Sequence, residues 1–398
     1  MAAEGTQPFQ QQPVPSATAG LAGAEDDMPR SRRRLGGAVK HVRIAARRRF
    51  GQLIAAGRGS QKVCRKGALA SESIRSVLVC RLNARMGNAL FLTPLIHQLH
   101  ELLPEATIDV ASAYPQAQDL FGHLPGVRAV IVFPYKGVQI PWRYVTALAR
   151  VRGHHYDLVI DPTTNSTSSR VVLGLCRARL RLGVAAEHQW APLTHAVHDS
   201  LMPPHRAIQP VFLLHWALGV AHVPSRLQLS IGRDATELAE ARALVRRALE
   251  RQGQDPSSAR PVGFFAHATG AKRFGRESWL KFWTNFQQLA PEAVPVEFLP
   301  TPHAAPMSPS FAALHVPTPR RLAAAMEQMG MFISADTGPM HLASSTAMPT
   351  VALFRASEPV FYRPLKPSDL TLDATHHSAA VLARLCYEHW QRCGAWRL

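Results

Sequence analysis

The 398-residue sequence lacks the cysteine patterns of disulfide-rich and zinc-binding proteins. Its few cysteines form no C-x-x-C pair and show no zinc spacing with the histidines; they are Cys64, Cys80, Cys176, Cys386 and Cys393. Scattered cysteines of this kind are typical of a reducing compartment. We therefore expect free thiols and no zinc site.

Long apolar runs are also missing. No stretch of about 20 apolar residues occurs, which excludes an ordinary transmembrane helix. The N-terminus has no apolar core of a secretory signal. Apolar residues still make up 46% of the chain and charged residues only 18%, so a large core can be buried. We expect a soluble cytoplasmic protein with about two to three domains.

Acidic residues are absent from residues 28–71, which hold thirteen of the 45 Lys and Arg. Residues 1–27 are rich in Ala, Gly, Gln and Pro and are expected to be disordered. Within residues 30–66, one helical face is apolar and consists of Val42, Ala46, Phe50, Leu53 and Ile54. This pattern favours a basic amphipathic helix on an anionic membrane, where each cation contributes about 1 kcal/mol. Nucleic acid is a less favoured partner, and a solvated basic tail without a partner is the alternative.

Apolar runs alternate with helical patterns from Ile74 onward. The expected strands are Ser76–Arg81, Thr107–Ala111, Val127–Phe133, Tyr156–Asp161 and Leu180–Val184. The expected helices between them are Ala89–Leu103, Trp142–Arg152 and a run that ends at Cys176. This alternation indicates a parallel, doubly wound sheet.

A second run of the same kind follows a charged helix, Ala235–Gln252, and a turn-rich break at residues 253–260. Its expected strands are Val262–His267, Val294–Leu299, Met331–Ser334 and Val351–Phe354, and its expected helices are Glu277–Leu289, Arg320–Met329 and Ser378–Trp396. The prediction is an α/β protein of two Rossmann-like domains with a cleft between them. The predicted boundaries are residues 1–73 for the arm, 74–232, 233–375, and 376–398 for a last helix.

The segment Met331–Phe354 contains one strand–turn–helix–strand unit in which Asp336 ends the first strand. Thr337 suits a helix N-cap and Pro339 the first helical turn. Gly338 permits close approach of a ligand, and the helix begins with Met340 and His341. This pattern favours a diphosphate at the start of the helix, with Asp336 or His341 on a hydroxyl. The alternative is that Asp336 and Thr337 only cap the helix and that His341 is a buried histidine.

The loop after strand Val262–His267 has a similar character. Gly270 lies within it, Thr269 and the loop amides can bind oxygens, and Lys272 and Arg273 can neutralise a leaving diphosphate. The alternative is a surface loop with two solvated cations. The pattern G-x-x-x-x-G-K-[ST] is absent here, which argues against an NTPase.

These motifs together resemble glycosyltransferase family 9, the ADP-heptose:lipopolysaccharide heptosyltransferases and their relatives. Four segments carry the resemblance, in order between about residues 74 and 364: Val77–Leu82 with Gly87 and Thr93–Leu95, Asp157–Asp161, Lys272–Phe274, and Asp336–His341 with Pro349. The resemblance implies a GT-B fold and transfer of a heptose from ADP-heptose to a lipid-linked saccharide, such as the lipopolysaccharide core. It implies no bound catalytic metal. It implies donor contacts from Lys272, Asp336, Thr337, Gly338, Met340 and His341.

The sequence departs from the family where the catalytic Asp follows Gly87, because residue 88 is Asn. An amide cannot accept the acceptor's proton, and a general base typically contributes 10²–10⁴-fold. Asp161 is the candidate substitute base, with a helix N-cap as the alternative role. Residues 301–310 contain no acid to hold the donor nucleoside, which leaves a base other than adenine open. Two hypotheses follow: an inverting glycosyltransferase, or a sugar-nucleotide-binding pseudoenzyme that acts as a scaffold.

Overall fold

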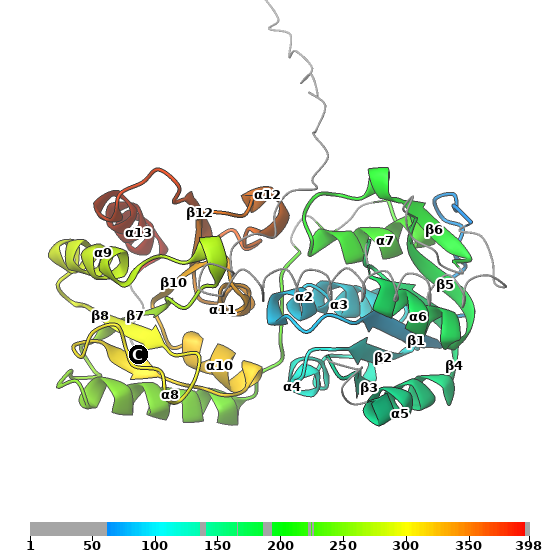
Figure 1. Ribbon diagram of the computed structural model, residues 1–398, viewed down its shortest axis with the longest axis horizontal. Helices are drawn as coiled ribbons and strands as arrows, with labels where there is room; N and C mark the ends of the chain where they lie inside the picture. The colour runs from blue at the N-terminus through cyan, green and yellow to red at the C-terminus, as the bar shows by residue number, and fades with distance from the viewer. Residues whose placement is uncertain are drawn as a thin grey trace, which may run out of the picture. The chain divides into compact units, whose positions relative to one another are not determined.

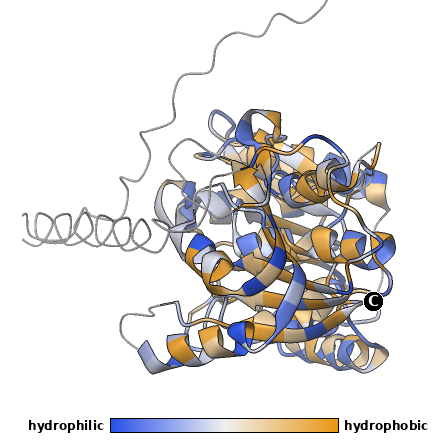
Figure 2. Ribbon diagram, turned by 90° about the vertical axis from the view of Figure 1, so that its right-hand side faces the viewer, coloured by the Kyte–Doolittle hydropathy of each residue, from blue (hydrophilic) through white to orange (hydrophobic). Residues whose placement is uncertain are grey.

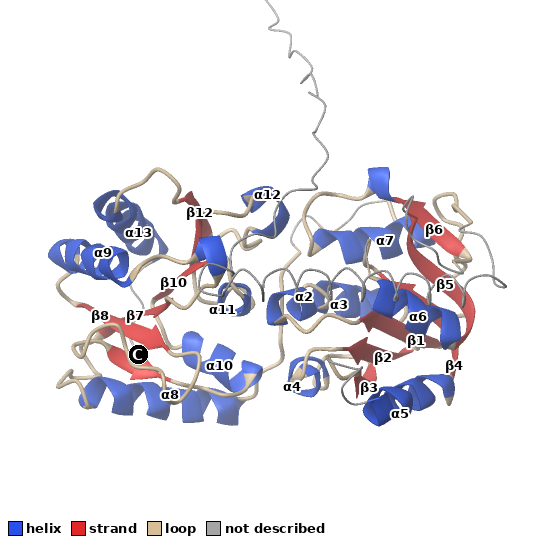
Figure 3. Cartoon of the chain, in the orientation of Figure 1, coloured by secondary structure: helices blue, strands red, loops and turns tan. Residues whose placement is uncertain are grey.

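The computed structural model describes residues 62–135, 141–164, 166–185, 193–221, 224 and 227–394. Within them the chain forms two α/β halves, each built on a six-stranded parallel sheet (Figures 1 and 3). The helices of this part of the chain include none that is long and apolar enough to span a bilayer. Residues 1–61 of the predicted arm, with most of the proposed membrane-binding segment 30–66, lie outside the described residues.

The N-terminal sheet has the strand order β3-β2-β1-β4-β5-β6. Its strands are β1 (Ser76–Arg81), β2 (Thr107–Ser112), β3 (Val127–Val132), β4 (His155–Asp161), β5 (Arg177–Ala185) and β6 (His195–His198). Its helices are α2 (Met86–Leu90), α3 (Thr93–Leu102), α4 (Ala117–Phe121), α5 (Pro141–Arg152), α6 (Thr167–Leu175) and α7 (Ile208–Leu218). Val77 and Val79 pack in the same core as α3 and α7, whereas Leu78 and Cys80 pack with α5 and α6.

The C-terminal sheet has the order β12-β11-β10-β7-β8-β9. Its strands are β7 (Arg260–Phe265), β8 (Ala293–Phe298), β9 (Ala312–Leu314), β10 (Met331–Ala335), β11 (Thr350–Phe354) and β12 (Leu370–Asp373). Its helices are α8 (Ala235–Glu250), α9 (Arg276–Leu289), α10 (Pro319–Met326), α11 (Gly338–Ala343), α12 (Pro359–Tyr362) and α13 (Ala379–Cys393). The side chains of α9 and α13 share one core with Phe264, Ile333 and Val351.

The central strands are buried on both faces. Every residue of β8, β10 and β11 is buried. Figure 2 shows strands that are mostly hydrophobic, between helices that are banded in hydrophilic and hydrophobic residues. Parallel strands covered by helices on both sides have this near-continuous apolar pattern, which is why the sequence predicts them. The predicted fold class, with two Rossmann-like halves, is confirmed.

Three differences from the expected elements have physical reasons. The edge strands β6, β9 and β12 were not predicted, because strands of three or four residues leave little pattern in a sequence. The folded part begins before Ile74: the Cys64 amide donates to the Ala196 carbonyl over 2.9 Å, on the outer side of β6. The predicted helix Ala89–Leu103 is two helices, α2 and α3.

The break between α2 and α3 arises from Pro94. An unbroken helix would have the residue 94 amide donate to the Leu90 carbonyl, but proline has no amide hydrogen. The Thr93 hydroxyl donates to that carbonyl instead, over 2.9 Å. The same hydroxyl accepts the Ser230 amide over 3.1 Å. The break therefore fixes α2 to the segment that leads into the C-terminal half.

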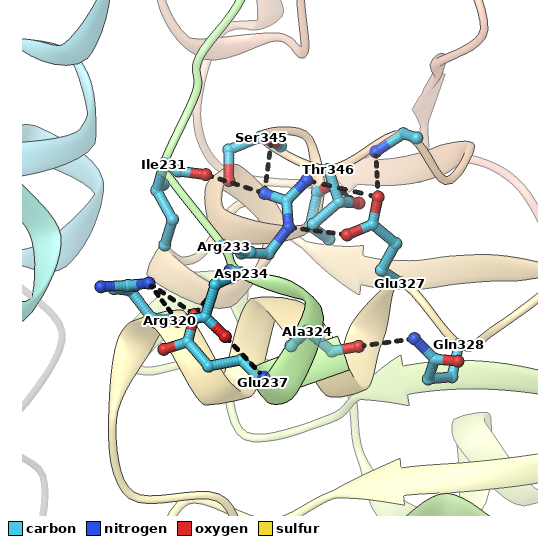
Figure 4. A network of polar contacts seen from close by, with 12 residues as sticks. Ile231, Arg233, Asp234, Glu237, Arg320, Ala324, Glu327, Gln328, Ser345 and Thr346 are labelled. Atoms are coloured by element: carbon cyan, nitrogen blue, oxygen red, sulfur yellow. Dashed lines mark hydrogen bonds and ion pairs between the residues drawn. The ribbon is translucent and has the colours of Figure 1, made fainter. Parts of the chain in front are cut away.

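A polar network fixes where that connecting segment enters the C-terminal half (Figure 4). Asp234 and Glu237 form a capping box at the start of α8. Arg320 of α10 donates to Glu237 over 2.5 Å. Arg233 forms an ion pair with Glu327 at 2.6 Å and donates to the Ile231 carbonyl. The network therefore joins the connection, α8 and α10 through charged hydrogen bonds.

Candidate functional site

The loops after three neighbouring strands bring a lysine, an aspartate and a serine together. Strands β7, β10 and β11 are adjacent in the sheet, and Lys272, Asp336 and Ser357 follow their carboxyl ends. Lys272 Nζ and Ser357 Oγ both donate to Asp336 Oδ2, the serine over 2.6 Å. Ligands bind outside the carboxyl ends of strands in open α/β sheets, so this cluster is the candidate binding site.

Asp336 is a buried carboxylate that donors surround. Its Oδ1 lies 3.4 Å from His341 Nε2, while Oδ2 accepts from Lys272 and Ser357. Burial alone would raise the pKa of Asp336, but the hydrogen bonds from His341, Lys272 and Ser357 outweigh it and hold this pKa well below its usual range. Asp336 is therefore an anion at neutral pH and orders the three side chains around it.

Helix α11 starts directly after this carboxylate. Thr337 is its N-cap, as predicted, and the Thr337 hydroxyl accepts the Met340 amide over 3.4 Å. Pro339 lies in the first turn, and Met340 and His341 are buried. His341 is thus a buried histidine with a polar partner, Asp336, and its contact with a ligand hydroxyl stays a prediction. Asp336 does not cap the helix, because its oxygens bind side chains instead.

The loop after β7 turns at Thr269 and Gly270 and returns toward Asp336. Gly270 has a φ of 62°, a conformation that favours glycine. Thr269 and Gly270 are exposed, and so is Arg273. The Lys272 side chain is 38% exposed and its Nζ lies 5.7 Å from the centre of the Tyr362 ring. Lys272 is therefore bound to Asp336 but still partly exposed to solvent. Arg273 forms no ion pair with any described carboxylate.

Helix α2 of the N-terminal half packs directly on α11. A Cβ on Gly87 would stand 2.7 Å from His341 Cδ2, and one on Gly338 would stand 3.0 Å from Met86 Cε. Phe91 packs edge-on against the His341 ring, with 4.7 Å between centroids. The contact between α2 and α11 therefore requires glycine at positions 87 and 338, whether or not a ligand binds there.

Asn88 lies on the same short helix and binds an arginine. Its Oδ1 accepts from Arg81 Nη2 over 3.2 Å. Arg81 is the last residue of β1, and its Nε is buried with no hydrogen-bond partner among the described residues. Burial lowers the pKa of Arg81 to about 10, Arg206 adds to the lowering, and Asp161 and Tyr362 oppose it. Asn88 is thus oriented by a cation rather than left free in solvent.

Asp161, the candidate substitute base, is fully buried at the end of β4. Its Oδ2 lies 2.9 Å from Arg170 Nε, and its Oδ1 accepts from the Thr163 hydroxyl and from the Thr163 amide at 3.0 Å. The N-cap of α6 is Ser166, so the alternative role of Asp161 as that cap is wrong. Both oxygens are occupied, which favours a structural partnership with Arg170.

The structure brings together the predicted residues of the loops after β7 and β10. Asn88 lies on α2, which packs against α11. Asp161 is paired with Arg170 in a buried cluster. Sequence reasoning missed Ser357, Arg81, Arg206 and Tyr362. Ser357 comes three residues after β11, so the rule about carboxyl ends of strands could have found it. The pairing of Arg81 with Asn88 depends on tertiary contacts that leave no local pattern in the sequence.

Comparisons with known proteins agree with this arrangement. The model of Glycosyltransferase family 9 (heptosyltransferase) matches residues 320–390, which include Asp336, His341 and Ser357. No protein of curated function matches the chain. The resemblance to family 9 that the motifs predict is confirmed in this segment.

Solved structures extend the likeness to the fold of both halves. The glycosyl transferase family 9 protein of Veillonella parvula DSM 2008 has a TM-score of 0.66 at 19% identity, covering 82% of this chain and 99% of that one. The E. coli ADP-heptose lps heptosyltransferase II has a TM-score of 0.61 at 17% identity, covering 80% and 98%. The E. coli heptosyltransferase WaaC with ADP has a TM-score of 0.57 at 14% identity, covering 80% and 99%. At these identities the likeness establishes the GT-B fold.

Proposed function

We propose, from the resemblance to glycosyltransferase family 9, that this chain transfers a sugar from a nucleotide-sugar donor to a cell-envelope glycan. Heptose is the first candidate sugar and ADP-heptose the first candidate donor, since solved structures of the same fold hold ADP and an ADP-heptose analogue. A lipid-linked acceptor such as the lipopolysaccharide core is part of the proposal. The observation that carries it is the cluster of Lys272, Asp336, His341 and Ser357 within and beside the matched segment.

The proposed donor site uses the loops after β7 and β10. Lys272 would meet the diphosphate, because its ammonium is partly exposed and Asp336 holds it in place. Thr269 and Gly270 would contribute a hydroxyl and an amide, and Arg273 a second cation. Thr337, Gly338, Pro339 and Met340 would border the sugar. Fixed cations near a leaving diphosphate stabilise the charge that develops there, which is usually a large term in catalysis.

The proposed reaction is an inverting displacement at the anomeric carbon of the donor. The acceptor would approach from the N-terminal half, past Asn88, while the nucleoside diphosphate leaves on the side of Lys272. The second candidate is a sugar-nucleotide-binding pseudoenzyme that scaffolds other envelope proteins. It is supported by Asn88 itself, since an amide takes no proton. Peripheral membrane contact at the inner face, through the basic arm of residues 30–66, remains part of the first proposal.

A thermal-shift panel tests donor binding. The full chain is heated with ADP-heptose, with other ADP-, UDP- and GDP-sugars, and with free nucleoside diphosphates. A ligand at about 100 times its dissociation constant adds about 2.7 kcal/mol of stability, which is easily detected. We expect a selective shift with one nucleotide that Lys272→Ala weakens at least about tenfold in affinity.

Lys281→Ala is the matched control for Lys272→Ala, because Lys281 is 66% exposed and, among the described carboxylates, forms an ion pair with Glu277 in the preceding turn of its helix. It should leave the nucleotide shift unchanged. If no nucleotide shifts the melting temperature, both candidate functions are contradicted. A normal shift without transfer to any envelope glycan would favour the pseudoenzyme.

A further inference from the structure

The guanidinium of Arg81 lies beside Asn88 and forms no ion pair with a carboxylate in the described part of the chain. Arg81 forms no ion pair with any described acidic residue, and its nearest carboxylate neighbour along the sheet, Asp161, is bound to Arg170 and Thr163. Among the described residues, its side chain donates a hydrogen bond to one group, the neutral Oδ1 of Asn88. Removing a charge from water is costly unless a partner compensates it, and the charge of Asp161 offsets this cost for Arg81 only in part.

A second cation, Arg206, lies within electrostatic range of Arg81. Arg206 is partly buried, lowers the pKa of Arg81 through its charge, and also forms no ion pair with a described carboxylate. Its Nη1 donates to Gln209 over 3.3 Å, and its guanidinium lies 5.4 Å from the centre of the Phe361 ring. Two neighbouring guanidinium groups held by neutral partners provide fork-shaped donors of the kind that bind phosphate and carboxylate groups.

Three titratable side chains of this region, Asp336, Asp161 and His205, are already engaged by other groups. Asp336 is held by three donors and stays ionised. Asp161 has both oxygens occupied. His205 is buried, its Nε2 is bonded to the Arg363 carbonyl at 2.8 Å, and burial lowers its pKa. A neutral hydroxyl acceptor would therefore find these three groups engaged and a cation, Arg81, beside Asn88.

We propose that the nucleophile of the acceptor is itself an oxyanion, a phosphate or a carboxylate, which Arg81 and Arg206 bind beside Asn88. This deepens the proposed function and rests on it for the transfer step. The acceptor oxygen attacks the anomeric carbon and forms the new C–O bond. The bond from that carbon to the diphosphate breaks, and its electron pair leaves with the nucleoside diphosphate. No proton moves, so no general base is needed.

The replacement Asn88→Asp provides the sharpest test of the anion site. It places a carboxylate of nearly equal size within reach of Arg81, so that the protein supplies its own anion. Inorganic phosphate is titrated calorimetrically into the full chain at constant ionic strength. We expect Asn88→Asp and Arg81→Gln each to weaken phosphate binding at least about tenfold, because each removes charged hydrogen bonds. Asn88→Asp should also raise the melting temperature, because the new carboxylate pairs with Arg81. A misfolded variant would instead have a lower melting temperature.

Two further variants locate the phosphate. Arg384→Gln is the control, since Arg384 is 64% exposed on α13, and it should bind phosphate like the wild type. Lys272→Ala should retain the phosphate binding that depends on Arg81, because that lysine belongs to the donor site. The inference is overturned if wild-type protein binds no phosphate, or if Asn88→Asp binds it unchanged. Loss of binding in Lys272→Ala alone would overturn it too, by placing the phosphate in the donor site.

The transfer step is tested with the nucleotide-sugar that gives the largest thermal shift. Methyl phosphate, acetate and a neutral methyl glycoside are offered as separate acceptors, and the products are identified by NMR. We expect a glycosyl phosphate or a glycosyl ester, and the productive acceptor shows which oxyanion is the substrate. Transfer only to the hydroxyl of the methyl glycoside would overturn the inference. Failure of the proposed function gives a different result: no nucleotide changes the melting temperature. The phosphate titration still tests the anion site in that case.

Discussion

Gly87 and His341 come from different halves of the chain and touch so closely that no side chain fits between them. A Cβ on Gly87 would stand 2.7 Å from His341 Cδ2. His341 cannot easily move away, because it is buried, packs against Phe91 and binds Asp336. The histidine of the candidate donor site is therefore a direct neighbour of the helix that carries Asn88.

Gly87→Ala should therefore destabilise the protein and weaken nucleotide binding together. Overpacking of this kind costs about 1–3 kcal/mol. The free energy of unfolding in urea and the nucleotide thermal shift measure the two effects. Gly153→Ala is the control, because its Cβ would meet the Ala149 carbonyl at an ordinary 3.4 Å. If the clash is the cause, Gly87→Ala should cost less stability in a His341→Ala background; an equal cost in both backgrounds would refute it.

The free energy of unfolding should depend on pH through Asp336. Its hydrogen bonds from His341, Lys272 and Ser357 hold its folded-state pKa below the ordinary value of about 3.9. A carboxylate with a lowered pKa contributes its full stability above about pH 4, and the contribution is lost as the pH falls toward the lowered pKa. The unfolding free energies of wild type and Asp336→Asn should converge as the pH falls below about 4. Curves that stay parallel would show that the Asp336 charge does not stabilise the fold. Glu250→Gln, at an exposed carboxylate at the end of α8, is the control.

Glu327→Ala should be strongly destabilising, because it leaves the Arg233 charge without its partner in a mostly buried place. The side chains of Arg233 and Glu327 are only 16% and 19% exposed. Breaking such a pair costs about 3 kcal/mol. Glu240→Ala removes the partner of Arg321 on the surface and should cost less than about 1 kcal/mol. Chemical denaturation of both variants measures the contrast, and similar costs would mean that the connecting segment does not depend on this ion pair.

Asp161 and Arg170 should behave as a structural pair. Asp161→Ala leaves a buried guanidinium uncompensated, which costs about 3–5 kcal/mol. The double replacement Asp161→Leu with Arg170→Met removes both charges, and we expect it to recover most of the stability and to retain sugar transfer. A stable double variant that has lost transfer by 10²–10⁴-fold would instead identify Asp161 as the general base.

The sequence predicts the central strands because burial on both faces makes them continuous apolar runs, as in Val77–Val79 and Val351–Phe354. It does not predict the short edge strands, which carry too few residues. The two donor-side loops are predictable because each follows such a strand. Arg81 with Asn88 and Arg170 with Asp161 are not, because each pairing joins side chains that only the folded chain brings into contact.

The Thr93 hydroxyl links two parts of the chain that the sequence separates by more than a hundred residues. It holds the end of α2 through Leu90 and the connecting segment through Ser230. Helix α2 carries Gly87 and Asn88, and the connecting segment carries Arg233 into the C-terminal half. One hydroxyl thus ties the position of the connecting segment to that of the helix that carries Asn88.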